Sequence, residues 1–401
     1  MGIRSWVALG AALAGVGAVQ APTAPYQTAL TRWRASDGGF ASWERHGIVV
    51  AADGSLVLDP ATARPGTDLY PAGGYHGRNF YNGASFIVGE ATSPVTQTSF
   101  AFREGIGSWN AATPPGTWVE MLVRARLGAR WTKWYNLGVW AESDGAVPRH
   151  SVDRQADADG TVSVDTLKLT YKKQDPANAY QLRVRLFGTT GSGVSSLQGA
   201  AVASSTTPDR PRALADGNPA YWSHALAVPE CSQMVYPDGG AVWCSPTSVS
   251  MVVAYWQHEN GPCEPRVRAT VAGVYDWMYD GDGNWPFNTA YASARGLESF
   301  VGRFTTMAEA ERWLDAGVPL VISYAWRNGD LTGAPIPSSD GHLTVLVGFD
   351  SNGNPVINDP AAASDADVQR TYSRAELETL WLHHSGGTVY AIYPAGWPIP
   401  H

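Results

Sequence analysis

A cysteine at the start of an apolar helix is the feature that most limits what this chain can fold into. The stretch from Trp243 to Trp256 reads WCSPTSVSMVVAYW. Pro246 stands where a helix accepts proline, in its first turn, because the missing N–H would have no partner there. Cys244 is therefore expected at a helix N-terminus, where the backbone dipole favours a thiolate. A buried structural thiol is the alternative interpretation. Four apolar residues at helical spacing predict one buried face of this helix: Val249, Val252, Val253 and Trp256.

The composition excludes some classes of protein. The 401 residues are enough for two domains with separate cores. Only 16% of them are charged, whereas there are 17 tryptophans and 43 glycines, a balance that indicates strand-rich structure. The net charge of −8 and the lack of a Lys/Arg cluster argue against nucleic-acid binding.

Residues 1–21 are predicted to be a secretory signal peptide. Arg4 supplies the positive charge, the run from Trp6 to Val19 is apolar and rich in small residues, and Ala18 or Ala21 could close the cleavage site. The run is shorter than the ~18–20 residues that a transmembrane helix needs, so an uncleaved anchor is the weaker alternative. No later segment reaches that length. We therefore expect a secreted or cell-surface protein with no membrane span after signal removal.

Residues 22–199 are predicted to form an all-β sandwich that is jelly-roll-like. Residues 118–126 and 131–140 alternate between apolar and polar, and a hairpin turn at Asp53-Gly54 separates two short β-type runs. No long helical period interrupts these runs. Many short strands separated by turns favour two packed sheets, and the lack of crossover helices argues against parallel βαβ units.

The same half carries many aromatic residues between its predicted strands. One interpretation is a binding module whose exposed rings stack on a polysaccharide. The other, which we favour, is that most of the rings belong to the sandwich core. The residues in question are Trp33, Phe40, Trp43, Tyr75, Phe80, Tyr81, Trp109, Trp131, Trp134 and Trp140.

Residues 200–218 are small, polar and interrupted by two prolines, which predicts an interdomain linker. The chain then changes character, and residues 219–401 predict an α+β domain in which helices precede antiparallel strands. Ser373 and Glu376 have the spacing of a helix capping box. Helices are expected over 267–278, 309–315 and 373–383, and strands over 318–325, 341–349, 355–359 and 387–393.

Two of these predicted strands, 341–349 and 355–359, are joined by a tight turn and should be antiparallel neighbours. His342 opens the first and Asp359 closes the second, so their side chains should meet. A carboxylate in that place can hold the imidazole tautomer and orientation. The alternatives are that Asp359 only initiates a turn before proline, or that Asn358 is the orienting group.

Gln233, upstream of Cys244, could complete such a site. Its side-chain amide can donate to an oxyanion together with the backbone N–H of the cysteine. The odd number of cysteines favours one disulfide and one free thiol. A pair between Cys231 and Cys263 would leave Cys244 free, and three free thiols are the other possibility.

The order Gln, Cys, His, Asp, in these local contexts, resembles the peptidase C39-like family of papain-like cysteine peptidases. The resemblance covers residues 219–401 and implies a papain-like fold with Gln233, Cys244, His342 and Asp359 as the site. Ser245 after the cysteine is a mild departure, because members often carry glycine there. The matching stretches are VPECSQ at 228–233, the cysteine helix at 243–256, GHLTVLVGFD at 341–350 and VINDPA at 356–361.

The resemblance implies acyl transfer at a peptide or amide bond, with no cofactor and no metal. The best-known members are exporter domains that trim leader peptides, and that role does not carry over because no P-loop or transmembrane segment occurs. We expect an exported cysteine peptidase (a thiol protease) acting on a peptide or peptidoglycan-like substrate. The alternatives are a carbohydrate-binding surface protein with an idle C39-like domain, and a cell-wall amidase or transferase.

Other polar patterns are weaker. The acidic turn at 153–160 is an incomplete calcium loop, and residues 279–286 lack the glutamate of an EF-hand. We expect the latter to be a mobile loop beside the cleft, with Trp285 and Trp326 as candidate substrate walls. His383 and His384 are explained by the dipole of a helix C-terminus rather than by a metal. Neither HExxH nor paired CxxC motifs occur.

Overall fold

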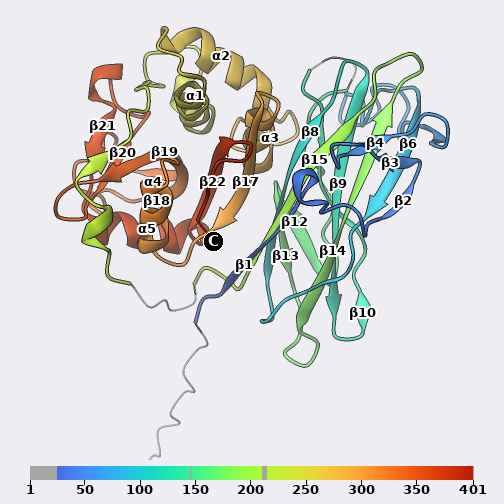
Figure 1. Ribbon diagram of the computed structural model, residues 1–401, viewed down its shortest axis with the longest axis horizontal. Helices are drawn as coiled ribbons and strands as arrows, with labels where there is room; N and C mark the ends of the chain where they lie inside the picture. Colours follow the sequence, from blue (N-terminus) through green and yellow to red (C-terminus); the bar gives the residue numbers. More distant parts are fainter. Residues whose placement is uncertain (1–24, 144, 146, 210–214, 401) are drawn as a thin grey trace, which may run out of the picture.

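The computed structural model describes residues 25–143, 145, 147–209 and 215–400. The predicted signal peptide lies outside the described residues. An all-β region and an α+β region lie side by side (Figure 1), as the sequence predicts. No helix among the described residues is long and apolar enough to cross a membrane.

The first region is a sandwich of two antiparallel sheets. Sheet A consists of β1 (Thr28–Arg34), β3 (Ile48–Val50), β4 (Leu56–Leu58), β8 (Glu104–Ala112), β12 (Gly160–Ser163), β13 (Thr166–Leu169) and β15 (Ser196–Ser205). Sheet B consists of β2 (Glu44–His46), β5 (Arg64–Thr67), β6 (Ser85–Thr92), β7 (Thr96–Gln97), β9 (Thr117–Leu127), β10 (Arg130–Trp131), β11 (Tyr135–Trp140) and β14 (Ala177–Gly188).

Strand order follows from the pairing. Sheet A runs β12-β13-β8-β15-β4-β3 with β1 beside β15, and sheet B runs β10-β9-β14-β6-β2 with β11 beside β9. Alternate residues of β14 show why the sheets pack: Leu182, Val184 and Leu186 are fully buried, whereas the residues between them are polar and partly exposed. Period-2 alternation therefore sends one face of each sheet into the core.

Most of the aromatic residues of this region are core, as we favoured. Three of them, Trp33, Trp131 and Trp134, are only partly buried. The buried ones are Phe40, Trp43, Tyr75, Phe80, Tyr81, Trp109 and Trp140.

The second region has one antiparallel sheet between helices. Its strands are β16 (His224–Ala225), β17 (Leu297–Arg303), β18 (Leu320–Trp326), β19 (Ser339–Phe349), β20 (Pro355–Asn358), β21 (Gln369–Thr371) and β22 (Thr388–Pro394), and its order is β17-β22-β18-β19-β20-β21 with β16 beside β19. The helices are α1 (Cys244–Gln257), α2 (Cys263–Val274), α3 (Trp285–Ser293), α4 (Met307–Asp315) and α5 (Arg374–Ser385). Val321 of β18 belongs to the core beneath α1, whereas its neighbours Leu320 and Ile322 belong to the core beneath α4 and α5.

Three local predictions differ from the structure. Helix α2 begins and ends four residues earlier than the predicted range of 267–278. Strand β15 continues to Ser205 because all of β1 pairs with its residues 199–205, so residues 200–205 of the predicted linker are strand. Helix α3 begins at Trp285, so its first two residues fall within residues 279–286, which we expected to be a loop, and the sequence predicted no element over 287–293. It forms because the Asn284 side chain caps it by accepting a hydrogen bond from Phe287 N, and Pro286 stands in its first turn.

The two regions share a continuous core. Phe287 of α3 packs against Trp140 and Trp109 of the sandwich, with ring centroids 5.4 and 6.0 Å apart. Gly138 makes this approach feasible, since a Cβ on it would lie 2.9 Å from the Phe287 ring. The Asn110 side chain donates to the Ser299 carbonyl of β17 at 2.9 Å. Figure 1 accordingly shows β17 and α3 as the parts of the second region nearest the sandwich.

Candidate active site

Cys244 is the first residue of α1, as the sequence predicts. No described side chain caps this helix end, so no side-chain acceptor competes for the N–H groups of the first turn. The thiol is free and partly exposed, because Cys231 and Cys263 form a disulfide. The pairing that we favoured is therefore the one in the structure.

His342 and Asp359 lie together at the mouth of the β19–β20 hairpin. His342 Nε2 lies 2.7 Å from Asp359 Oδ1, and both residues are buried. Cys244 is near enough to His342 to contribute to the raised pKa of its imidazole. Since Asp359 occupies Nε2, Nδ1 is the ring nitrogen left for the thiol. The structure thus joins three of the four candidate residues in one chain of contacts.

The electrostatics of the pair favour a charged imidazolium. Burial alone would lower the pKa of His342, but the charge of Asp359 and hydrogen bonds with Asp359 and Cys244 raise it to about 10. Burial acts to raise the pKa of Asp359, yet the charge and hydrogen bond of His342 hold it below its ordinary value. Near neutral pH the pair is an imidazolium beside a carboxylate.

Tyr372 is a member of the site that the sequence analysis missed. Its hydroxyl donates to Asp359 Oδ2 at 2.7 Å, while Ala361 N donates to Oδ1 at 2.9 Å. The carboxylate is therefore held on both oxygens. Tyr372 follows β21, the neighbour of β20, and only the register of those two strands brings it to Asp359. No spacing in the sequence marks that register.

The alternative orienting residue, Asn358, is directed elsewhere. Its side-chain amide donates to Val228 O at 3.1 Å and accepts from Gln369. The turn role of Asp359 exists beside its contact with His342, because Ala362 N donates to Asp359 O. Asp359 therefore both initiates a turn and contacts His342.

Gln233 is buried in the loop that leads to α1. Its Nε2 donates to Gly240 O at 2.7 Å, which leaves the second N–H of the amide without a partner in the described residues. Its Oε1 is also buried and unpartnered within the described ranges. Among the described residues, no hydrogen bond joins the Gln233 side chain to Cys244 or His342. Gly240 is required here, since a Cβ on it would lie 1.9 Å from Gln233 O.

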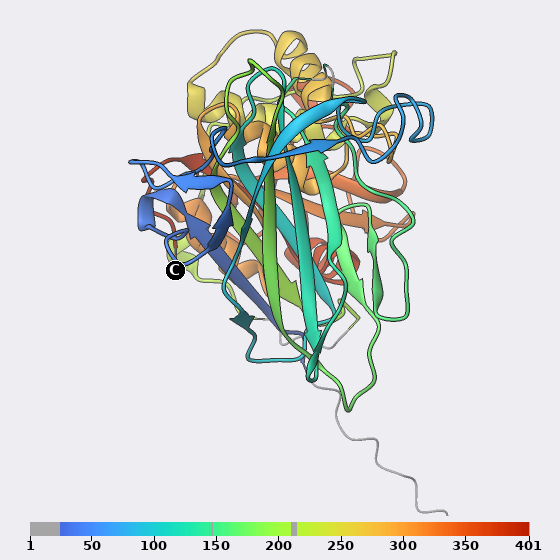
Figure 2. The ribbon, with the colours of Figure 1, turned by 90° about the vertical axis from the view of Figure 1, so that its right-hand side faces the viewer.

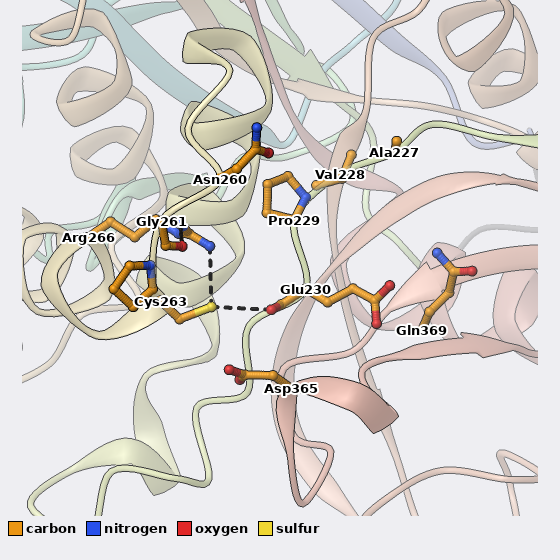
Figure 3. Close-up of a pocket in the computed structure, with 11 residues that line it drawn as sticks. Ala227, Val228, Pro229, Glu230, Asn260, Gly261, Cys263, Arg266, Asp365 and Gln369 are labelled. Carbon is orange, nitrogen blue, oxygen red and sulfur yellow. Dashed lines mark hydrogen bonds between the residues drawn. The ribbon is translucent and has the colours of Figure 1, made fainter.

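The Cys231–Cys263 disulfide anchors the loop that carries Gln233. A cavity of about 450 Å³ lies next to it, lined among others by Glu230, Arg266 and Asp365 (Figure 3). Asp365 Oδ1 accepts from Ser232 N at 2.7 Å, so the segment that carries Gln233 is tied at two adjacent residues. None of the four candidate residues lines the cavity.

Aromatic residues surround the imidazole. The rings of Trp326 and His342 are 5.5 Å apart at 67°, and those of Tyr324 and His342 are 5.9 Å apart at 85°. Trp326 is only 3% exposed, so it shields the imidazole rather than lining an open substrate wall. Trp285 and Cys244 are both partly buried and pack against the same core.

The sandwich reaches this part of the molecule through Asp165, which the sequence analysis did not single out. Its Oδ2 accepts a hydrogen bond from Trp285 N at 2.9 Å. Asp276 ties the preceding loop, accepting from Tyr279 N and from the Asn284 side chain. The segment we expected to be mobile is therefore held by buried carboxylates.

The polar patterns that we set aside bind other protein groups. Asp157 accepts from the Tyr135 hydroxyl, and Asp159 pairs with Arg130. His383 and His384 lie in the last turn of α5. No group of three or more metal-ligating side chains occurs among the described residues.

Comparison with known families assigns both regions. Residues 225–389 match the model of the Peptidase_C39 like family, and residues 29–205 match the Peptidase C39 N-terminal domain. The C-terminal half of this chain belongs to the Peptidase C39-like family. It is a peptidase-like domain preceded by the N-terminal domain that accompanies it.

Other comparisons add little. No curated protein matches the chain. Among solved structures, TmCBM61 in complex with beta-1,4-galactotriose has a TM-score of 0.21 and 9% identity over 42% of this chain and 92% of that chain. A family two carbohydrate esterase from Cellvibrio japonicus has a TM-score of 0.19 and 10% identity over 57% and 50% of the two chains. These scores are too low to indicate a shared fold.

Proposed function

We propose that this protein is an exported cysteine hydrolase that cleaves peptide or peptide-like amide bonds. The observation that carries the proposal is the contact between His342 and Asp359 beside Cys244, at the start of α1. A thiol, a base and an orienting carboxylate in hydrogen-bonded sequence are the minimum for nucleophilic acyl transfer. The family match supports a peptidase-like activity.

In the proposed reaction, the Cys244 proton rests on His342, and the thiolate attacks the carbonyl carbon of the scissile amide. The backbone N–H of Cys244 and the second N–H of the Gln233 amide stabilise the oxyanion. The C–N bond then breaks as His342 transfers its proton to the departing amine. Water attacks the thioester, His342 takes a proton from it, and the acid and the free thiol are released. Asp359 and Tyr372 hold the imidazole in place throughout.

The experiment is hydrolysis by the full chain of a random peptide library and of peptidoglycan fragments, read by mass spectrometry as new amine and carboxylate ends. We expect Cys244→Ala to abolish every new end, whereas Ser36→Ala, at an exposed serine of the sandwich region, leaves them unchanged. If the Cys244→Ala variant still cleaves both substrates, the proposal is contradicted. Cleavage of peptidoglycan fragments alone favours the amidase alternative.

The signal-peptide pattern of residues 1–21 supports export. N-terminal sequencing of protein recovered from the medium of expressing cells tests this. Cleavage after Ala18 or Ala21 is expected, and an intact N-terminus in cell-retained protein contradicts export.

A further inference from the structure

The outer face of sheet B carries a connected array of arginine and tryptophan side chains. Arg124 and Arg126 of β9, and Gln181 and Arg183 of β14, alternate with buried core positions and are partly exposed. Figure 2 looks onto the side of the molecule that carries sheet B, with the α+β region behind it. We call this array the Arg–Trp face; it comprises Arg124, Arg126, Trp131, Trp134, Gln181 and Arg183.

The two tryptophans are fixed by arginine. The Arg124 guanidinium carbon lies 4.5 Å from the Trp131 ring centroid and 4.6 Å from that of Trp134. Arg183 lies 4.2 Å from the Trp134 centroid. Stacking of this kind pre-orients a ring at the surface before any ligand arrives.

Trp131 and Trp134 are not part of the buried core of the sandwich. Seven of the ten aromatic residues considered in the sequence are buried, and Trp33 packs edge-on against Trp43 with centroids 5.4 Å apart. Trp131 and Trp134 remain, and both lie beside Arg124. The two rings lie close together on one face of the sheet, whereas surface aromatics without a common role are usually scattered singly.

The face also has an excess of positive charge. Arg183 and Arg185 pair with Glu90, at 3.1 and 2.9 Å. Arg124, by contrast, donates to the neutral amide oxygen of Gln181, at 3.1 Å through Nε. Burial lowers the pKa of Arg124 with no carboxylate to offset it.

Arg126 likewise has neutral side-chain partners. It donates to Gln97 and Asn178, at 3.0 and 3.3 Å. Within the described part of the chain, neither Arg124 nor Arg126 has a carboxylate partner. Two guanidinium groups without a carboxylate partner thus lie beside two fixed indole rings. This combination suits a carboxylated sugar polymer, because rings contact the apolar faces of sugars and arginine binds carboxylate through charge-assisted hydrogen bonds.

We infer that the Arg–Trp face binds a polysaccharide that carries carboxylate groups. Trp131 and Trp134 contact the sugar rings, Arg124 and Arg126 bind the carboxylates, and Gln181 is available to the hydroxyls. The site is independent of the proposed hydrolysis, because it lies on the sheet turned away from Cys244. Its role is to hold the proposed hydrolase on an acidic glycan surface.

The test is affinity electrophoresis of the full chain through gels that contain polygalacturonate, alginate, dextran or xyloglucan. We expect retardation by the two acidic polymers only, weakening as salt rises. Trp134→Ala and the double variant Arg124→Gln/Arg126→Gln should each weaken binding at least tenfold. Trp397→Ala, at an exposed tryptophan of the other region, should not change it.

The double arginine variant breaks no ion pair, so it keeps the test valid if Trp134→Ala fails to fold. Far-UV circular dichroism and the melting temperature establish the fold of each variant. No retardation by either acidic polymer overturns the inference. So does equal retardation by the neutral polymers, or acidic binding that both variants leave intact.

Discussion

His342 Nε2 lies 2.7 Å from Asp359 Oδ1, across the mouth of the β19–β20 hairpin. This contact directs the other ring nitrogen to Cys244 and gives the imidazole a charged partner in a buried place. It depends on strand register: β19 pairs with β20 through Val345 and Asn358, with an irregularity at Leu346–Gly348. The hairpin is thus the element that assembles base and acid.

Removing the negative charge of this pair should suppress hydrolysis without dismantling the fold. Asp359→Asn presents an amide to Nε2 and permits the wrong imidazole tautomer, so we expect kcat/KM to fall on the order of 1000-fold or more. Tyr372→Phe removes only one hydrogen bond to the carboxylate and should cost about tenfold. Steady-state hydrolysis of a cleaved library peptide measures both. Asp350→Asn, in the turn of the same hairpin, is the control and should retain full activity.

Gln233 should matter for catalysis far more than for stability. Loss of one oxyanion donor typically costs about 100- to 1000-fold in kcat. Gln233→Ala should therefore lower kcat by that factor and leave KM within about threefold, because the donor acts in the transition state. Gln257→Ala, at the exposed end of α1, serves as the matched control. An unchanged kcat in Gln233→Ala would remove this residue from the mechanism.

Stability should depend on pH through His342. Its folded pKa of about 10 lies above the ordinary value of 6.5, so the protonated ring stabilises the folded state. That contribution is complete below pH 6.5 and disappears as the pH rises through 10. Denaturant unfolding at several pH values should show this loss in the wild type and not in His342→Asn. His384→Asn should keep the wild-type slope; a wild-type slope in His342→Asn itself would contradict the charged pair.

The disulfide should stabilise both the fold and the Gln233 loop. Cys231 and Cys263 are 32 residues apart, a loop for which cross-linking contributes roughly 3–4 kcal/mol. Cys231→Ser/Cys263→Ser should lower the free energy of unfolding by about that amount, as measured with urea. Reductant should destabilise the wild type similarly and leave the double variant unaffected. Equal urea midpoints for wild type and variant would show that the cross-link is dispensable.

Local patterns predicted much of the candidate site. The start of α1 follows from Pro246 and the apolar spacing after it, and the meeting of His342 with Asp359 follows from one short turn. The N-cap at Ser373 is also as predicted, since its side chain accepts from Glu376 N. Glu376 itself departs from the capping box, because its carboxylate accepts from Thr332 instead.

What the sequence could not reveal depends on contacts between distant segments. Tyr372 reaches Asp359 only through the pairing of β20 with β21, and Asp165 reaches Trp285 only because the sandwich packs on α3. Helix α3 is short and apolar on most sides, so it has no amphipathic period to detect. It is buried between the two regions, and burial on all sides removes the polar face that would have marked it as a helix.

The most direct test of the central claim is mass spectrometry of the native full chain after treatment with the epoxide inhibitor E-64. A nucleophilic Cys244 activated by His342 predicts one adduct, located on Cys244, together with complete loss of peptide cleavage. His342→Ala should slow adduct formation at least 100-fold, whereas His384→Ala should not. Absence of an adduct on Cys244, or full peptide cleavage by the Cys244→Ala variant, would contradict the account.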